Sequence, residues 1–479
     1  MLSDDQQEIF NSYKNGENIF ITGPGGCGKS YLIKYIVHDA IQQNKKFSVT
    51  ALTGCAAILL GCGSKTIHSW AGIGLAKAND DVIATRIAMN KFKRRNWNKT
   101  ELLIVDEVSM MSLRLFNLLD SIGKKIRKNS KPFGGIQIIF CGDFYQLPPV
   151  GNTGDPDSFK FCFESEHWDE TFDSQHILDK SYRQTDDTYV NLLNEIREGQ
   201  ISKYYYNILK NRVGVTYPED IKTKPVMLEP TKHTVNSINK NEMDKLEGDV
   251  FKFKYKINIR LPEYNNSYIK ELKEVVSVKM NPEYIDADGN IEKLLLLEKA
   301  NILKILNARI PRGQPKYPGI KEIINAIDFL EKNSHFSRTQ CFKIGSQVMC
   351  TANINMDLGI YNGSVGYITQ IKNDGVKVNF NNCGEHWILY NDWETEIVPN
   401  VLFKQIPLML AWAVTIHKSQ GATLDYAEIN VGKSVFAEGQ TYVALSRVRS
   451  LDGLFLSSLD KSRIKVNPKV VEFYKQFYE

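Results

Sequence analysis

The clearest chemistry in the sequence lies in a glycine-rich segment, "GPGGCGKS", which follows a short apolar run at residues 18–22. Gly23, Gly28, Lys29 and Ser30 match the spacing G-x-x-x-x-G-K-[ST] of a phosphate-binding loop. In such a loop backbone N–H groups point inward, and the following helix directs its positive end at the phosphates. We expect Lys29 to reach the β- and γ-phosphates of a nucleotide and Ser30 to ligate Mg²⁺. The nucleotide-binding residues predicted in this segment are Gly23, Gly25, Gly26, Cys27, Gly28, Lys29, Ser30 and Tyr31.

An acidic pair ends the buried-strand pattern of "ELLIVDEVSMM". A parallel sheet builds its ligand crevice at the carboxyl ends of its strands, where Asp106 and Glu107 would lie. We expect Asp106 to hold Mg²⁺ through its water shell, and Glu107 to orient and deprotonate an attacking water. The second carboxylate favours hydrolysis over phosphoryl transfer to a small molecule. The structural alternative is an acidic strand end that caps the next helix.

Three further polar residues extend this prediction. Gln146, in "IIFCGDFYQLPPV", follows another buried strand and is placed to sense a γ-phosphate. Arg183 in "KSYRQTD" and Arg447 in "TYVALSRVRS" are distant cations, the second on a predicted helix. A guanidinium brought from another lobe onto the γ-phosphate raises the rate by about 10³ to 10⁵. Hydrolysis is therefore predicted to depend on closure of two lobes.

The elements that position these residues form several sets. Residues 1 to about 165 alternate buried-strand runs with helical stretches, which predicts an α/β lobe with a parallel sheet covered on both faces. Short β-like runs at 343–400, spaced by about ten residues, suggest a small barrel. Further buried-strand candidates, which form a single sheet only if the residues between them are a separate excursion, lie at 224–230, 408–416, 426–432 and 453–459.

The segment from about 240 to 342 is less regular. In "KFKYKINIRL" a strand would place Lys252, Lys254 and Lys256 on one face and aromatic and aliphatic residues on the other. That face could follow a nucleic-acid backbone, but an edge strand with solvated lysines is the favoured interpretation. Helices are predicted for "IEKLLLLEKANILKIL" and "KEIINAIDFLEKN".

Composition sets the outer limits. The 479 residues suggest about three domains, and the net charge of +5 permits a polyanionic partner without requiring one. The eight cysteines are scattered, so free thiols are expected, and the spacing of Cys55, Cys62 and His68 matches no standard zinc pattern. No apolar run is long enough for a membrane span. We expect a soluble intracellular protein; the sequence does not distinguish nucleus, cytoplasm and viral replication site.

The order and wording of several motifs resemble the Pif (petite integration frequency) family of DNA helicases, in superfamily 1B. These motifs are "GPGGCGKS", "LLIVDEVSMMSLRLFNLLDSI", "KPFGGIQIIFCGDFYQLPPV", "SYRQTD", "AWAVTIHKSQGATL" and "YVALSRVRSLDGL". The resemblance implies an α/β fold of two RecA-like motor domains, with a small Src-homology-three-like β-barrel inserted in the second. The implied parts are motor domain 1A at 1–165, the first part of domain 2A at 166–240, an insertion at 241–342, barrel 2B at 343–400 and the rest of 2A at 401–479.

The resemblance also implies roles for single residues. Gln6 would read adenine and Gly421 would approach the γ-phosphate. Trp70 is assigned either base stacking or core packing. Without the resemblance, His68 and His417 would rather be buried, hydrogen-bonded histidines. Contacts to the DNA strand would come from Thr53, Gly54, His68, Trp70, Thr415, His417, Ser419 and Gln420, which suit binding without base readout.

The implied activity is ATP-driven 5′ to 3′ translocation on single-stranded DNA with unwinding of duplex junctions, in replication, repair or recombination. ATP and Mg²⁺ are the implied cofactors, and a monomer on DNA is expected. One alternative is a DNA-independent phosphate-loop ATPase that remodels protein complexes. Another is a passive single-strand binder with a vestigial ATPase. RNA also stays open as the tracked strand. The 241–342 insertion is a lineage insertion, a strand-separating wedge or a partner surface; the sequence does not choose among them.

Overall fold

The computed structural model describes residues 2–477 except 61, 75–78, 185, 219–221, 260–303, 305–306, 309–318, 334–335, 356 and 395–400. Two compact units make up the chain. The larger comprises Met1–Phe251, Phe342–Ile388 and Leu408–Glu479, and the smaller comprises Lys252–Cys341 and Leu389–Pro407. Every residue predicted at the nucleotide site or as a strand contact of the helicase motifs therefore belongs to the larger unit. The lysine face at 252–256 belongs to the smaller one.

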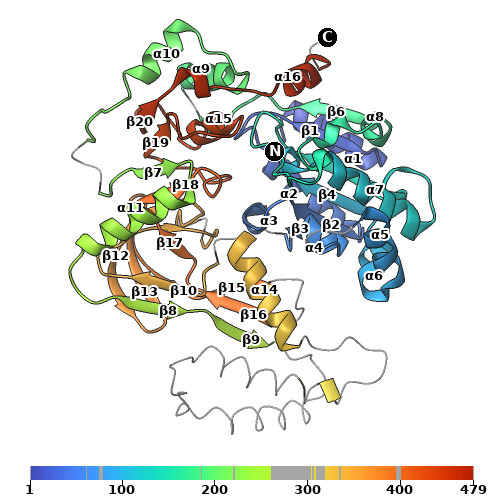
Figure 1. Cartoon of the computed structure of the whole chain (residues 1–479), viewed down its shortest axis with the longest axis horizontal. Coiled ribbons are helices and arrows are strands. Elements are labelled where there is room, and N and C mark those ends of the chain that lie inside the picture. Colours follow the sequence, from blue (N-terminus) through green and yellow to red (C-terminus); the bar gives the residue numbers. More distant parts are fainter. Residues whose placement is uncertain are drawn as a thin grey trace. The chain divides into compact units, whose positions relative to one another are not determined.

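A six-stranded parallel sheet organises the N-terminal half of the larger unit (Figure 1). Because its strands are parallel, the loops that follow them meet at one edge. In sheet order the strands are β3 (Lys65–Thr66), β2 (Phe47–Ala51), β4 (Leu102–Asp106), β5 (Gln137–Cys141), β1 (Ile19–Thr22) and β6 (Ser174–Ile177).

Both faces of this sheet are covered, as predicted. Alternate residues of β4 face opposite cores: Leu102 and Ile104 join one buried cluster, and Leu103 and Val105 join the other. The first cluster takes side chains from α1 (Asp4–Asn15), α2 (Lys29–Gln42) and α3 (Gly54–Leu60). The second takes them from α4 (Ile67–Ala71), α5 (Asp80–Met89), α6 (Lys91–Lys99), α7 (Leu113–Arg127) and α8 (Trp168–Thr171).

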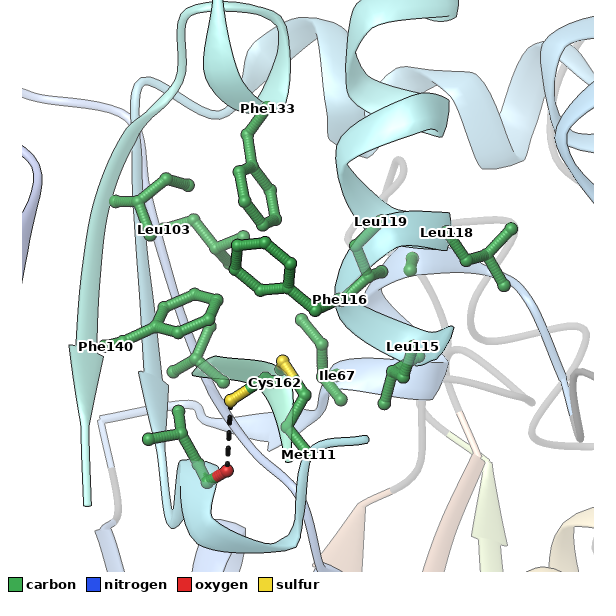
Figure 2. Close-up of a cluster of buried hydrophobic side chains, with 14 of the residues drawn as sticks. Ile67, Leu103, Met111, Leu115, Phe116, Leu118, Leu119, Phe133, Phe140 and Cys162 are labelled. Carbon is green, nitrogen blue, oxygen red and sulfur yellow. Dashed lines mark hydrogen bonds between the residues drawn. The ribbon is translucent and has the colours of Figure 1, made fainter. Parts of the chain in front are cut away.

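The second cluster is dominated by aromatic side chains. Figure 2 shows Phe116 of α7 directed at Phe140 of β5, with Phe133 above them. The Phe116 ring lies 5.5 Å from Phe133 and 6.0 Å from Phe140, both edge to face. Such pairs add about 0.5–1.5 kcal/mol beyond area burial, so this core fixes β5 and the loop after it.

Two segments extend the first domain beyond its predicted end at residue 165. β6 pairs with β1 at the edge of the first sheet. The C-terminal helix α16 (Pro468–Lys475) packs Val470 and Tyr474 into the aromatic second cluster of the first sheet and not against the second sheet. The Tyr474 hydroxyl lies 2.5 Å from Thr22 Oγ1 and accepts from Phe144 N–H.

A four-stranded parallel sheet organises a second α/β domain of the larger unit, with the order β18 (Ala413–Thr415), β7 (Val226–Glu229), β19 (Ala427–Val431) and β20 (Leu454–Leu459). Its core includes α9 (Asp187–Arg197), α10 (Lys203–Lys210) and α15 (Gln440–Leu445), and α11 (Lys232–Lys245) packs beside β18 and β7. The strands predicted at 224–230, 426–432 and 453–459 thus share one sheet with the second part of the 408–416 run, whereas its first part, β17 (Leu408–Leu410), pairs with β11 in another sheet.

A five-stranded antiparallel sheet is inserted in this domain, which confirms the predicted β-rich excursion. Its order is β14 (Gly384–Leu389), β13 (Gly375–Phe380), β12 (Val365–Lys372), β11 (Gln347–Cys350) and β17 (Leu408–Leu410).

The smaller unit contains β8 (Phe251–Lys254), β9 (Lys256–Ile259), β10 (Thr339–Phe342), β15 (Asn391–Glu394), β16 (Val401–Gln405) and α14 (Ile320–Asn333). The helix predicted at 321–333 is confirmed, whereas that predicted at 291–306 lies largely outside the described residues. Lys252, Lys254 and Lys256 are exposed and Phe253 is buried, as an edge strand requires. Every cysteine whose side chain is described is a free thiol. Among the described helices, none has the length and apolar character needed to cross a bilayer.

Candidate nucleotide site and strand-binding turn

The phosphate loop connects β1 to α2. Gly28, at the start of α2, has a φ of +89°, a conformation that favours glycine. Gly23 has a φ of +142°, and a Cβ there would lie 2.2 Å from the Leu178 carbonyl oxygen. Lys29 Nζ donates to the carbonyl oxygens of Gly23 (2.7 Å) and Pro24 (2.9 Å). The lysine thus lies across the loop whose amides would cradle phosphate.

The charge of Lys29 is well supported. Burial alone would lower the pKa of its ammonium group, but neighbouring Cys27, Cys141 and Asp143 together raise it above its usual value. The ammonium group is therefore a fixed positive charge beside the loop. Ser30, the next residue, is exposed to solvent.

The acidic pair lies at the end of β4, on the same sheet edge as the phosphate loop. Burial, followed by the charge of Glu107, raises the pKa of Asp106 to about 7. Burial also raises the pKa of Glu107. Glu107 adopts a left-handed backbone conformation (φ +58°, ψ +40°), and its N–H donates to Asp106 Oδ1 at 2.9 Å. Strain at a non-glycine residue of this kind is typical of functional sites.

Two arginines lie beside the phosphate loop: Arg183 in the segment after β6 of the first sheet, and Arg447 after α15 of the second domain. A Cβ on Gly25 would lie 3.3 Å from Arg447 Nη2 and 3.4 Å from Arg183 Nη1. Arg447 is 2% exposed; its Nε donates to the Val443 carbonyl oxygen at 2.8 Å. Burial and then the charge of Arg183 lower the pKa of Arg447 to about 9. Arg447 follows the end of α15 by two residues, so it lies just beyond the helix on which the sequence placed it.

Two residues that the sequence analysis missed hold this arrangement. Tyr442 of α15 accepts a hydrogen bond from the Gly25 N–H through its hydroxyl, at 2.9 Å. Gln184 donates to the carbonyl oxygens of Ser446 (3.2 Å) and Val448 (3.0 Å), on both sides of Arg447. Gln184 adjoins Arg183 in one motif and Tyr442 lies five residues before Arg447 in another, and this closeness in sequence could have indicated their roles.

Gln146 lies in the turn after β5, where its N–H donates to the Asp143 carbonyl oxygen. A Cβ on Gly439, immediately before α15, would lie 2.4 Å from the Gln146 carbonyl oxygen, so this turn touches the second motor domain. Beside it Asp143, fully buried, pairs with Arg197 of α9 at 2.9 Å. The Arg197 guanidinium also stacks 4.4 Å from the Tyr145 ring centroid.

The predicted adenine-reading residue, Gln6, is buried beside the loop, since a Cβ on Gly28 would lie 2.7 Å from its Nε2. Its Oε1 accepts from the Ser3 N–H, which closes the capping box of α1. Tyr31 is 50% exposed on α2, and Gly421 is exposed with a φ of +80°.

The strand-contact residues predicted in the first domain follow β2 and β3 at the same sheet edge. Thr53 Oγ1 accepts from Ala56 N–H at the start of α3, whose first residue is Gly54. His68 lies half-buried in α4, and burial lowers its pKa. The stacking role of Trp70 is contradicted: it is 0% exposed and packs 4.5 Å from the Trp97 ring. A fully buried indole cannot stack on a base, so the core-packing alternative holds.

The second set lies in the turn after β18. Thr415 and His417 are half-exposed, and the His417 ring stacks on Phe436 with centroids 5.9 Å apart. Ser419 is 0% exposed and donates to the Ile416 carbonyl oxygen, which leaves its side chain no access to a strand. Gln420 Nε2 donates to Glu107 Oε2 at 2.9 Å, so its amide lies at the nucleotide site. The strand contact expected of Ser419 is therefore wrong for its side chain.

The site suits Mg²⁺ held together with a nucleotide. Among the described residues, no three His, Cys, Asp or Glu side chains converge as a metal cluster. Mg²⁺ binds through one or two carboxylates with phosphate oxygens and water rather than through a full protein cage. One carboxylate at the end of β4 and one hydroxyl at the start of α2, Asp106 and Ser30, are a donor set of this kind.

Known proteins resemble this chain in sequence and in fold. A family model described as PIF1-like helicase matches residues 1–207. An ATP-dependent DNA helicase PIF1 of Danio rerio is 33% identical over 99% of this chain and 64% of its own length. The ATP-dependent DNA helicase Pif1 of Psychrobacter sp. is 32% identical over 95% of this chain and 68% of its own length. A crystal structure of the Candida albicans Pif1 helicase matches with a TM-score of 0.70 and 28% identity, covering 100% of this chain and 99% of that one.

The fold is thus that of two RecA-like motor domains with a β insertion, the class of superfamily 1B motors. Within that class, the chain belongs to the PIF1-like helicase family. It spans about two thirds of the length of the curated relatives it matches.

Proposed function

We propose that this chain is an ATP-dependent DNA helicase that translocates 5′ to 3′ along single-stranded DNA and unwinds duplex junctions. The observation that carries the proposal is the convergence of Arg183 and Arg447 on Gly25 of the phosphate loop. The first sheet supplies the nucleotide-binding edge and, in the segment after β6, Arg183, and a connection of the second sheet supplies Arg447. The names of the family relatives, ATP-dependent DNA helicases, support the substrate assignment.

In this mechanism Lys29 and the loop amides bind the ATP phosphates, with Gln6 beside the base. Mg²⁺, held by Ser30 and Asp106, would offset phosphate charge. Glu107 accepts a proton from the attacking water, while Arg183 and Arg447 stabilise the charge that develops on the γ-phosphate. Arg447 comes from the second motor domain, so turnover requires that the two motor domains close.

Strand binding is assigned to the half-exposed polar residues at the two sheet edges, Thr53, Gly54, His68, Thr415 and His417. Small hydroxyls, imidazoles and backbone N–H groups contact phosphate and sugar without reading bases. Opening a base-pair step costs on average about 1.4 kcal/mol in stacking, which one nucleotide cycle covers.

The experiment compares unwinding of matched DNA duplexes with a 5′ or a 3′ single-stranded tail, with and without ATP and Mg²⁺. We expect only the 5′-tailed duplex to open. Lys29→Ala should abolish both unwinding and ATP hydrolysis, whereas Lys34→Ala, on the exposed face of the same helix, should retain both. Opening of the 3′-tailed duplex alone would reject the polarity. ATP hydrolysis indifferent to any strand would favour the protein-remodelling alternative, and an RNA-tailed duplex tests the tracked polymer.

A further inference from the structure

The amide of Gln420 joins the predicted strand-binding turn to the predicted general base. Gln420 follows β18 of the second sheet, and Glu107 follows β4 of the first, 313 residues away in sequence. The amide nitrogen donates to Glu107 Oε2 at 2.9 Å. The general base of the nucleotide site is thus contacted by the segment that carries Thr415 and His417.

The turn between these residues is closed by its own hydrogen bonds. The Thr415 carbonyl oxygen accepts from Ser419 N–H at 3.0 Å. The Thr415 hydroxyl accepts from Lys418 N–H at 3.2 Å. The His417 carbonyl oxygen accepts from Gln420 N–H at 3.4 Å. These bonds tie Gln420 to Thr415 and His417 around the buried Ser419, so a shift of the backbone at Thr415 or His417 would displace the Gln420 amide.

The bond also competes with the chemistry of Glu107. A general base accepts a hydrogen bond from the water that it activates. An amide N–H that donates to the same carboxylate occupies one acceptor position of Oε2 and lowers the basicity of Glu107.

We propose that Gln420 is a positioning residue that withholds the Glu107 carboxylate until a strand engages the turn after β18. Strand engagement shifts the turn, withdraws the amide and frees Glu107 Oε2 for the attacking water. The proposal rests on the proposed function, because it takes Glu107 as the base and the turn as a strand contact. It supplies the physical link between strand binding and ATP hydrolysis.

The test is Gln420→Leu in the full chain, which removes the donor and keeps the side-chain size. We expect the kcat for ATP hydrolysis without DNA to rise about tenfold, the effect of one hydrogen bond to a charged group. The KM for ATP should not change, and stimulation by oligo(dT) should fall correspondingly. Gln42→Leu, the same substitution at the exposed end of α2, is the matched control. Adding Glu107→Gln to Gln420→Leu should abolish the extra turnover.

Two outcomes would overturn the proposal. An equal loss of kcat with and without oligo(dT) would mean that Gln420 holds Glu107 in its productive position. Unchanged DNA-free turnover with weaker oligo(dT) binding, measured by fluorescence anisotropy, would make Gln420 a strand contact only. Gln420→Asn, which keeps an amide but shortens its reach, should repeat the effect of Gln420→Leu if the latter folds poorly. Failure of the proposed function is separate: wild-type hydrolysis would then ignore oligo(dT) and neither tailed duplex would open.

Discussion

The two parallel sheets of the larger unit contribute different groups to one candidate site. Loops at the carboxyl edge of the first sheet carry the phosphate loop and the acidic pair Asp106 and Glu107. The second sheet's connections supply the amide donor Gln420, the hydroxyl acceptor Tyr442 and the cation Arg447. The first edge can hold a nucleotide and a water. In the proposed mechanism Arg447 stabilises the charge that forms during hydrolysis, so the first edge is incomplete without the second sheet's connection.

The largest effect is expected from Arg447→Ala, which removes the cation that the second sheet's connection supplies. We expect kcat for strand-stimulated ATP hydrolysis to fall about 10³-fold, because the γ-phosphate loses a transition-state cation. Binding of a fluorescent ATP analogue should persist, since the first sheet holds the nucleotide. Arg447→Lys should not rescue turnover, because an ammonium group lacks the planar fork. Arg449→Ala, two residues away and half-exposed beside Asp425, is the control. Full turnover in Arg447→Ala would refute the proposal that the second sheet's connection supplies a catalytic cation.

A smaller effect is expected from the first-sheet side of the same contact. Gly25 has no positive φ, so Gly25→Ala is tolerated by the backbone, but its Cβ would crowd both guanidinium groups at 3.3 and 3.4 Å. Because misplacement by about 1 Å costs about 10²-fold in rate, we expect kcat to drop by about tenfold to a hundredfold. Gly154→Ala, where a Cβ meets nothing within 4 Å, controls for the substitution. Unchanged kcat would show that the arginines act elsewhere.

The smallest effect is expected on the melting temperature, and it tests whether Asp106, buried at the edge of the first sheet, carries a charge. The pKa of Asp106 is raised from 3.8 to about 7. Its stabilising contribution is therefore full below about pH 4 and is lost as the pH rises through 7. Asp106→Asn, without nucleotide or Mg²⁺, should melt a few degrees above wild type at pH 8.

That gain should shrink at pH 5.5, where the wild-type carboxyl is largely protonated. Asp157→Asn, at an exposed carboxylate, should show no such pH-dependent gain. Equal melting differences at both pH values would mean that Asp106 is ionised throughout this range.

The nucleotide half of the site could be predicted because its signals are local. The phosphate loop and the acidic pair each occupy a few consecutive residues between a strand and a helix, where glycines and buried-strand patterns fix backbone geometry. The parallel sheet, its covered faces and the β-rich insertion follow from the same short-range periodicity.

The errors arose where the decision depended on packing. A tryptophan beside polar residues suits a base or a core equally, and only the Trp97 contact shows that Trp70 is buried. Ser419 and Gln420 adjoin Thr415 and His417 in sequence, yet one side chain is turned inward and the other reaches Glu107. The predicted domain end at 165 likewise could not show that β6 and α16 join the first domain.

By itself the sequence determined which residues could bind a phosphate, ligate a metal and activate water, because these capacities reside in side chains and turns of a few residues. Only the tertiary structure shows which residues, distant in sequence, lie beside these phosphate-binding, metal-binding and water-activating residues. Gly25 and Tyr442 are 417 residues apart and Glu107 and Gln420 are 313 apart. Contacts at such separations depend on how buried faces of two sheets pack, and no local pattern of residues encodes that.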